Sequence, residues 1–220
     1  MTFVRSEHFF LSPTKTKSKG DGSRLRTVPI NLKRVNILNY ATIKKFDIAN
    51  GPGVRVSLFV SGCRHHCKNC FNKEAWDFNY GKPFTEEVVK EILAACDHDH
   101  IEGLSLLGGE PFEKENRGGL ITLVKQFRER FPNKTIWCYT GFLLDDELIS
   151  SGDDDAMELI SYIDVIVDGR FVEELKNLAL MFRGSSNQRI IDVKKTLEKG
   201  EVVLLEGKWE RTMGSGDIYE

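Results

Sequence analysis

Three cysteines, Cys63, Cys67 and Cys70, stand close together in a C-x3-C-x2-C run of this 220-residue chain. Thiolates are soft ligands that suit iron–sulfur clusters and zinc. Three thiolates on one short segment can hold three irons of a cubane and leave the fourth iron open to another ligand. Clusters that only transfer electrons usually have four thiolates. The spacing therefore predicts a [4Fe-4S] cluster that can bind a substrate.

Zinc is the alternative metal for this run, because His65 and His66 lie between the cysteines. Structural zinc sites usually combine two separated pairs of ligands, and the sequence has no second pair. We interpret His65 and His66 as solvent-facing loop residues, since the cysteines suffice for a cluster. The other two cysteines, Cys96 and Cys138, lie within apolar patterns and are predicted to be small core residues.

A second candidate site is the turn Gly108-Gly109-Glu110-Pro111, which follows an apolar segment. Two glycines allow the backbone to approach a ligand closely, and its N–H and C=O groups can then bind that ligand. The Glu110 carboxylate could hold an ammonium group. Such a turn is a weak signal alone, and it gains weight beside the cysteine run.

The elements that must position these residues alternate between strands and helices. Segments rich in β-branched and aromatic residues predict strands at 54–60, 104–107, 135–139, 164–167 and, as a late strand or hairpin arm, 202–205. Apolar stripes at helical spacing predict helices after Thr85, over 120–127 and near 156–162. Short apolar strands alternating with helices imply parallel β/α units, in which chemistry takes place where the strands end.

The bulk composition narrows the class of protein. The formal net charge is −2, but residues 1–34 carry eight basic and two acidic side chains, which leaves 23 basic and 31 acidic residues in the remainder. Such an acidic body is a poor general nucleic-acid binder. No apolar stretch is long enough to cross a bilayer, so we expect no membrane partner. Five cysteines, three of them clustered, favour one metal site in a reducing cytoplasm over a secreted disulfide framework.

The sequence divides into three parts. Residues 1–34 are basic and polar without periodicity and are interpreted as a disordered tail. The alternatives are an organelle-targeting peptide or a translation start at Val35. Residues 35–191 hold the motifs as one domain, and residues 192–220 are expected to form a C-terminal extension with a hairpin and a tail.

A string of motifs carries a specific resemblance. The cysteine run followed by Phe71, with Gly-Gly-Glu-Pro downstream, resembles the radical S-adenosylmethionine enzymes. The segment NGPGVR at 50–55 looks like the opening of glycyl-radical-enzyme activases. The segments FNK…W at 71–76, IW…TG at 136–141, VDGRF at 167–171 and RGSSNQ at 183–188 look like those of the activating proteins of anaerobic ribonucleoside-triphosphate reductase. The resemblance covers residues 36–191.

This resemblance implies a fold and a set of cofactor ligands. The fold would be an α/β partial (β/α) barrel with a mostly parallel sheet. The implied ligands of the [4Fe-4S] cluster are Cys63, Cys67 and Cys70. The residues implied to line S-adenosylmethionine are Asn69, Cys70, Phe71, Gly109 and Glu110. Phe71 would pack near the adenine, and the Gly109 backbone would hydrogen-bond the methionine amino group.

The resemblance also implies a reaction and its partners. One electron entering the cluster would split the sulfonium C–S bond of S-adenosylmethionine. The resulting 5′-deoxyadenosyl radical would abstract hydrogen from a glycine of the large catalytic subunit of the reductase, and a reduced flavodoxin-like protein would donate the electron. The chain departs from the family pattern at Phe71, where tyrosine is expected, and at Glu110, where close relatives often have aspartate.

Several alternatives stay open. The chain could activate another glycyl radical enzyme such as pyruvate formate-lyase, or be an electron-transfer iron–sulfur protein or a zinc-binding module. Asp168 could lie at the rim of the active site or only cap a turn. Arg183 could contact the reductase or pair with an acid. The run 153–155, three aspartates, is interpreted as a solvated helix start.

Overall fold

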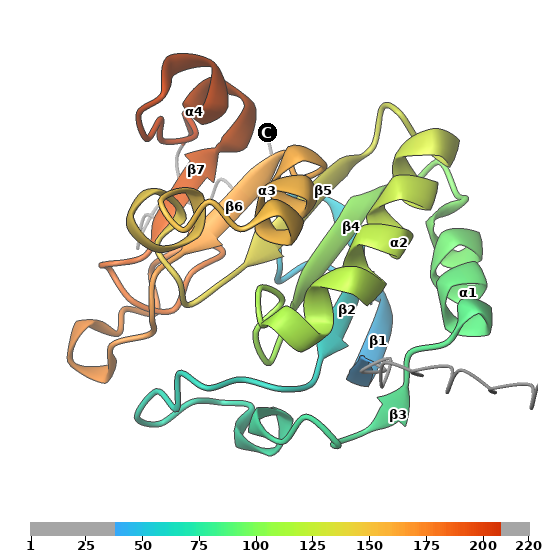
Figure 1. The fold of residues 1–220 in the computed structure, drawn as a ribbon, viewed down its shortest axis with the longest axis horizontal. Helices are drawn as coiled ribbons and strands as arrows, with labels where there is room; N and C mark the ends of the chain where they lie inside the picture. Colours follow the sequence, from blue (N-terminus) through green and yellow to red (C-terminus); the bar gives the residue numbers. More distant parts are fainter. Residues whose placement is uncertain (1–37, 208–220) are drawn as a thin grey trace, which may run out of the picture. The chain divides into compact units, whose positions relative to one another are not determined.

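The computed structural model describes residues 38–207, and within them seven strands form one sheet in the order β3-β1-β2-β4-β5-β6-β7 (Figure 1). The strands are β1 (Asn39–Asp47), β2 (Val54–Val60), β3 (Lys82–Pro83), β4 (Ile101–Gly108), β5 (Thr135–Tyr139), β6 (Val165–Asp168) and β7 (Arg189–Asp192). The helices are α1 (Glu86–Cys96), α2 (Lys114–Arg130), α3 (Asp154–Ser161) and α4 (Val193–Lys199). Short 3-10 or π-helical turns are η1 (Lys73–Trp76), η2 (Leu144–Ile149) and η3 (Glu173–Leu175).

The middle of the sheet is parallel and its two sides are antiparallel. The neighbours β2, β4, β5 and β6 pair in parallel, whereas β1 pairs antiparallel with β2 and β3, and β7 pairs antiparallel with β6. The predicted α/β class with parallel β/α units is confirmed for this central part. Over the described residues the sheet stays open rather than closing on itself.

The predicted elements agree with the structure best where the chain is apolar. The bounds of β2 and β5 match the predicted 54–60 and 135–139, and the segment 202–205 lies along β7 through the single bridge between Ile191 and Leu204. Three strands were not predicted, namely β1, β3 and β7. The expectations for residues 1–34 and for the chain beyond residue 207 lie outside the described residues.

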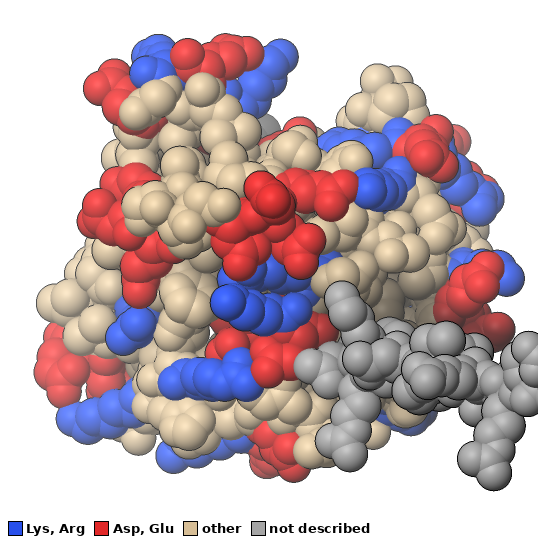
Figure 2. All heavy atoms as spheres, in the orientation of Figure 1, with Lys and Arg blue, Asp and Glu red and all other residues tan. Residues whose placement is uncertain are grey.

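Helices α1, α2 and α3 lie together on one face of the sheet (Figure 1). They bury apolar side chains such as Ile92, Leu120 and Phe127, each with no exposed area, and burial of each such side chain stabilises the fold by about 1.5–3 kcal/mol. Cys96 and Cys138 belong to this core, as predicted. On the same face basic and acidic side chains are interspersed (Figure 2), and Lys125 of α2 pairs with Glu158 of α3 at 2.5 Å.

The opposite face carries a smaller apolar cluster and a buried cation. Trp137 packs there with strand residues from β6 and β7. The fully buried Arg55 donates to Ser105 Oγ at 2.8 Å and to the Leu104 and Thr135 carbonyl oxygens at 2.9 and 2.8 Å. These bonds satisfy the guanidinium N–H groups inside the fold. Buried side chains therefore lie on both faces of the sheet, and the carboxyl ends of its parallel strands share one edge.

Two helix starts also follow the sequence. Asp153 is the N-cap of α3, where its side chain accepts from the Ala156 N–H, so the interpretation of the aspartate run as a helix start is confirmed. Thr85 precedes α1 at the N-cap position without a side-chain capping bond. None of the described helices is long and apolar enough to cross a membrane.

Candidate iron–sulfur site

The three cysteines lie on one loop between β2 and η1, here called the cysteine loop and defined as residues 61–72. Cys63 is buried at the start of the loop, and Cys67 and Cys70 are half-buried. His66 and Asn69 have φ angles of 51° and 57°, which coil the loop tightly. The Cys70 N–H donates to the Cys67 carbonyl at 3.1 Å. The loop therefore holds three thiols on a short turn of chain.

The surroundings of Cys63 and Cys67 favour the protonated thiol over the thiolate. Burial raises the pKa of Cys63 to about 11, although backbone N–H groups of His65 and His66 that face its sulfur act in the opposite direction. Burial also raises the pKa of Cys67, against the Phe171 N–H that bonds its sulfur. Because the thiolate is the ligand form, binding of a metal cluster must release protons from these groups.

The donor set of the loop fits an iron–sulfur cluster. All three donors are thiols, the ligand type that such clusters take, and N–H groups that face a cysteine sulfur are typical of their surroundings. In residues 38–207 no three His, Cys, Asp or Glu side chains are already gathered into a metal-binding group. The chain thus supplies the donors on one segment.

The loop between β4 and α2 packs directly against the base of the cysteine loop. The Gly109 N–H donates to the Val60 carbonyl at 2.7 Å, so its own carbonyl is the group left for a ligand. A Cβ atom added at Gly109 would lie 2.5 Å from the Gly62 oxygen and 2.8 Å from the Ala75 oxygen. Only glycine permits this approach of two backbones.

Glu110 lies at the centre of three loops. Its side chain is 1% exposed and takes four hydrogen bonds. Oε1 accepts from the Phe112 N–H at 2.9 Å and the Thr140 hydroxyl at 2.8 Å. Oε2 accepts from the Gly141 N–H at 2.8 Å and lies 2.9 Å from His65 Nε2. We expected this carboxylate to hold an ammonium group, but the structure surrounds it with donors from the chain itself.

The prediction that both histidines face solvent is wrong for His65 and confirmed for His66. The His65 side chain is 7% exposed, and its ring meets the Phe142 ring edge-on at 4.4 Å. A Cβ at Gly141 would lie 2.4 Å from the His65 ring, so the glycine makes room for it. His66 is exposed and stacks on Trp76 at 4.6 Å. The partner of His65 is 45 residues away, so no local pattern reveals it.

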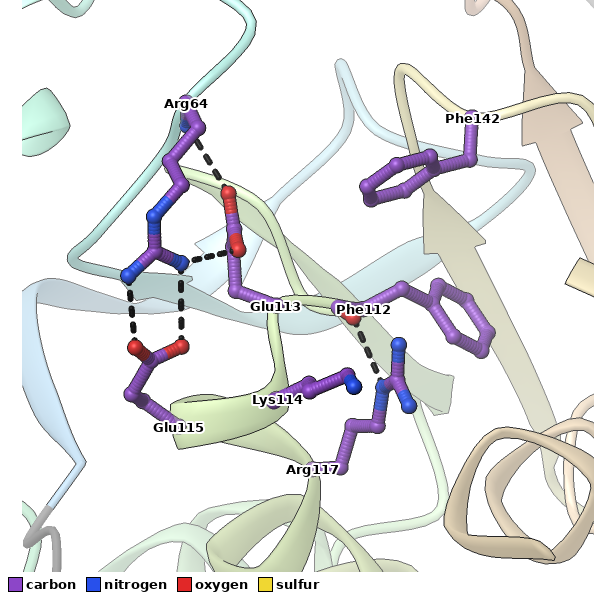
Figure 3. Close-up of a pocket in the computed structure, with 7 residues that line it drawn as sticks. All are labelled: Arg64, Phe112, Glu113, Lys114, Glu115, Arg117 and Phe142. Atoms are coloured by element: carbon purple, nitrogen blue, oxygen red, sulfur yellow. Dashed lines mark hydrogen bonds and ion pairs between the residues drawn. The ribbon is translucent and has the colours of Figure 1, made fainter. Parts of the chain in front are cut away.

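Arg64 makes a second connection between the same two loops. Its N–H donates to Glu113 Oε1 at 2.9 Å, and its guanidinium pairs with Glu113 and, at 2.6 Å, with Glu115. Figure 3 shows this guanidinium between the two carboxylates. The group borders a cavity of about 400 Å³ whose other lining residues are Phe112, Lys114, Arg117 and Phe142.

The loop between β6 and β7 contacts the cysteine loop from another side. The Phe171 N–H faces the Cys67 sulfur, and Lys68 pairs with Glu174 at 2.8 Å. The RGSSNQ segment closes this loop, because Gln188 Oε1 accepts from the Gly184 N–H at 2.8 Å and Gln188 Nε2 donates to the Gly169 carbonyl at 3.0 Å. The segment therefore shapes a loop that touches the cysteines.

Asp168 and Arg183 form hydrogen bonds and ion pairs with other residues of the chain in this region. Asp168 has no exposed area, accepts from the Leu144 N–H at 2.9 Å and pairs with Arg189. These contacts join the end of β6 to β7 and to η2. They fit a residue that caps a turn better than one at the rim of the active site. Arg183 donates to the Gln188 carbonyl at 2.8 Å.

The remaining residues predicted to line a ligand lie at the surface. Phe71 is 83% exposed, and Asn69 is exposed beside the half-buried Cys70. Their roles toward a ligand stay predictions. Sequence reasoning missed His65, Glu113 and Phe171 as contacts of the site, whereas the Thr140-Gly141 pair was visible as a motif at a strand end.

Comparisons with known proteins agree with the prediction of an iron–sulfur cluster on the cysteine loop. A family model described as a 4Fe-4S single cluster domain matches residues 49–191. A protein of Salmonella typhi named anaerobic ribonucleoside-triphosphate reductase-activating protein is 42% identical over 153 residues, 69% of this chain and 96% of the relative. Proteins of the same name are 41% identical in Escherichia coli K12, over 69% of this chain and 96% of the relative, and 40% identical in Enterobacteria phage T4, over 70% and 93%. Such identity along nearly the full relatives shows that this chain belongs to the family of anaerobic ribonucleoside-triphosphate reductase-activating proteins.

Proposed function

We propose that this chain activates anaerobic ribonucleoside-triphosphate reductase by reductive cleavage of S-adenosylmethionine at a [4Fe-4S] cluster. The observation that carries the proposal is the run Cys63, Cys67 and Cys70 on a loop packed against the Gly109 backbone. The family matches support the cluster and name the reductase as the partner of the relatives.

When bound, the cluster would supply the one electron needed for reductive cleavage of S-adenosylmethionine, and the radical chemistry that follows would leave a glycyl radical on the reductase. Cys63, Cys67 and Cys70 would hold three irons as thiolates. The Gly109 carbonyl would accept from the methionine ammonium group. Asn69 and the exposed Phe71 would lie along the nucleoside and shield it from water.

The open sheet supports the finer fold proposal, a partial (β/α) barrel of the radical S-adenosylmethionine type. Its central strands are parallel, and the loops after β2, β4 and β5 meet at Glu110. An open edge above these loops would admit a glycine segment of the partner. We further propose a reduced flavodoxin-like donor and a cytoplasmic location.

The test is anaerobic reconstitution with iron and sulfide, followed by reduction with S-adenosylmethionine and the purified reductase. We expect a glycyl radical signal by electron paramagnetic resonance and formation of 5′-deoxyadenosine. Cys67→Ala should abolish both, and the buried core variant Cys96→Ala should retain both.

Other outcomes identify the alternative functions. A glycyl radical on pyruvate formate-lyase but not on the reductase would assign a different partner. A cluster without 5′-deoxyadenosine formation would indicate electron transfer only, and stoichiometric zinc after anaerobic purification would indicate a zinc module.

A further inference from the structure

We propose that His65 and Glu110 form a positioning pair, whose hydrogen bond sets where the cluster lies relative to the Gly109 carbonyl. The inference rests on the proposed function, which places the cluster on the cysteine loop and the methionine amino group at Gly109. Glu110 would then assist binding by holding the two loops in place, and it would not contact the ligand itself.

The positions of the pair in the sequence suit this task. His65 is two residues from Cys63 and two from Cys67, and Glu110 directly follows Gly109. The bond between the two side chains therefore joins both halves of the proposed site by a short covalent route on each side. Movement of one loop relative to the other would have to stretch or break this bond.

The bond is well suited to fix a distance. Nε2 of His65 and Oε2 of Glu110 are 2.9 Å apart, and the two side chains are 7% and 1% exposed. In the tautomer that carries its proton on Nε2, the imidazole donates this hydrogen bond to the carboxylate oxygen. A hydrogen bond to a charged group in such a dry environment is stronger and more directional than one in water.

Each partner is also held by contacts that do not involve the other. Glu110 is fixed by the Phe112 and Gly141 N–H groups and by the Thr140 hydroxyl. The His65 ring lies against Phe142 in the space that Gly141 leaves. Both groups are thus oriented before a ligand arrives, which is what a positioning role requires.

A purely structural role makes a different prediction from a positioning role. If Glu110 only stabilised the fold, loss of any donor to its carboxylate would have a similar effect. If the pair positions the cluster, only loss of the His65 link should change ligand binding. Thr140→Val is the matched control, because it removes a buried donor to the same carboxylate, together with the acceptor of the Phe142 N–H, and keeps both His65 and Glu110.

The experiment compares reconstituted wild-type protein, His65→Leu, His65→Gln and Thr140→Val. Each is assayed for iron per chain, the Kd of S-adenosylmethionine, the shift that this ligand causes in the electron paramagnetic resonance spectrum of the reduced cluster, and unfolding in urea. We expect His65→Leu to load iron like the wild type, to bind S-adenosylmethionine about tenfold more weakly or worse, and to lose the spectral shift. His65→Gln, which keeps a donor at a similar reach, should restore most of both, and Thr140→Val should lose stability only.

Other results would overturn the inference. A wild-type Kd and spectral shift in His65→Leu would show that the bond positions nothing. Equal weakening by Thr140→Val would show a general structural role, and loss of iron from His65→Leu alone would make His65 part of cluster binding. If the wild type itself shows no response to S-adenosylmethionine, the proposed function fails first, and the role of the pair falls with it.

Discussion

The loop between β4 and α2 and the loop between β6 and β7 both contact the cysteine loop, but they do so with different chemistry. The first uses buried groups, in which the Gly109 backbone and the Glu110 carboxylate touch the chain around the cysteines. The second uses an exposed ion pair between Lys68 and Glu174, whose side chains are 70% and 65% exposed, together with the Phe171 N–H that faces the Cys67 sulfur.

The two kinds of contact differ in how well they can fix the positions of the loops. Buried hydrogen bonds to charged groups hold distances because water cannot replace them, whereas exposed ion pairs contribute little and are screened by salt. We therefore expect the β4–α2 side to fix the site and the exposed ion pair on the β6–β7 side to tolerate change.

Gly109→Ala should have the largest effect. Its Cβ would collide with two backbone oxygens, of Gly62 and Ala75, neither of which can rotate away. We expect a loss of about 3 kcal/mol or more in the free energy of unfolding, measured in urea on the cluster-free protein. Gly118→Ala is the control, because its Cβ meets nothing within 4 Å in helix α2, and it should raise stability by about 0.5–1 kcal/mol. Equal stability of the two variants would contradict the packing described here.

Gly141→Ala should act through His65. The added Cβ would lie 2.4 Å from the imidazole ring, which should displace the ring and cost about 1–2 kcal/mol of stability. The double variant with His65→Ala should recover most of this loss, since the colliding ring is gone. Additive losses in urea unfolding would place the strain elsewhere.

Arg64→Ala should have an intermediate effect of about 1–2 kcal/mol, because Glu113 is buried but Arg64 is largely exposed. The hydrogen bond from Arg64 lowers the pKa of Glu115 below its ordinary value. A lowered carboxyl pKa means that the pair stabilises the fold above the ordinary glutamate pKa and stops doing so as the pH falls through the lowered value. The difference in stability between the wild type and Arg64→Ala should therefore shrink on acidification, and a difference that grows would contradict this reading.

Lys68→Ala should have the smallest effect. The hydrogen bond from Lys68 lowers the pKa of Glu174, and both groups lie at the surface. In the variant, titration followed by nuclear magnetic resonance should show the Glu174 pKa rising toward its ordinary value while stability in urea stays close to that of the wild type. A marked loss of stability or of cluster loading would mean that the β6–β7 side is as important as the β4–α2 side.

The sequence predicted the elements and motifs whose signals are local. Strands such as 54–60 and 135–139 are continuous apolar runs, and their bounds are confirmed. Strand β1 was missed because its polar, lysine-containing sequence with Lys44 and Lys45 lacks clear alternation, and β7 because only two of its four residues are apolar.

The thiol donors of the candidate site could be predicted from the sequence, but the residues that hold their loop in place could not. Cys63, Cys67 and Cys70 can be recognised from their spacing. The role of His65, in contrast, depends on a carboxylate that only the fold brings near. Glu110 was noticed for its charge, and its partners are long-range contacts that no single-sequence pattern contains. Residues that act by positioning another residue are in general the hardest to predict from sequence, because their function depends on distances that only the folded chain sets.

The central claim is that three thiolates hold a four-iron cluster and leave one iron open for S-adenosylmethionine. Mössbauer spectroscopy of protein reconstituted with iron-57 tests it most directly, with spectra taken before and after the ligand is added. We expect the spectrum of one iron site to change while the other three stay as they were. A spectrum that is unchanged at all four sites would contradict it.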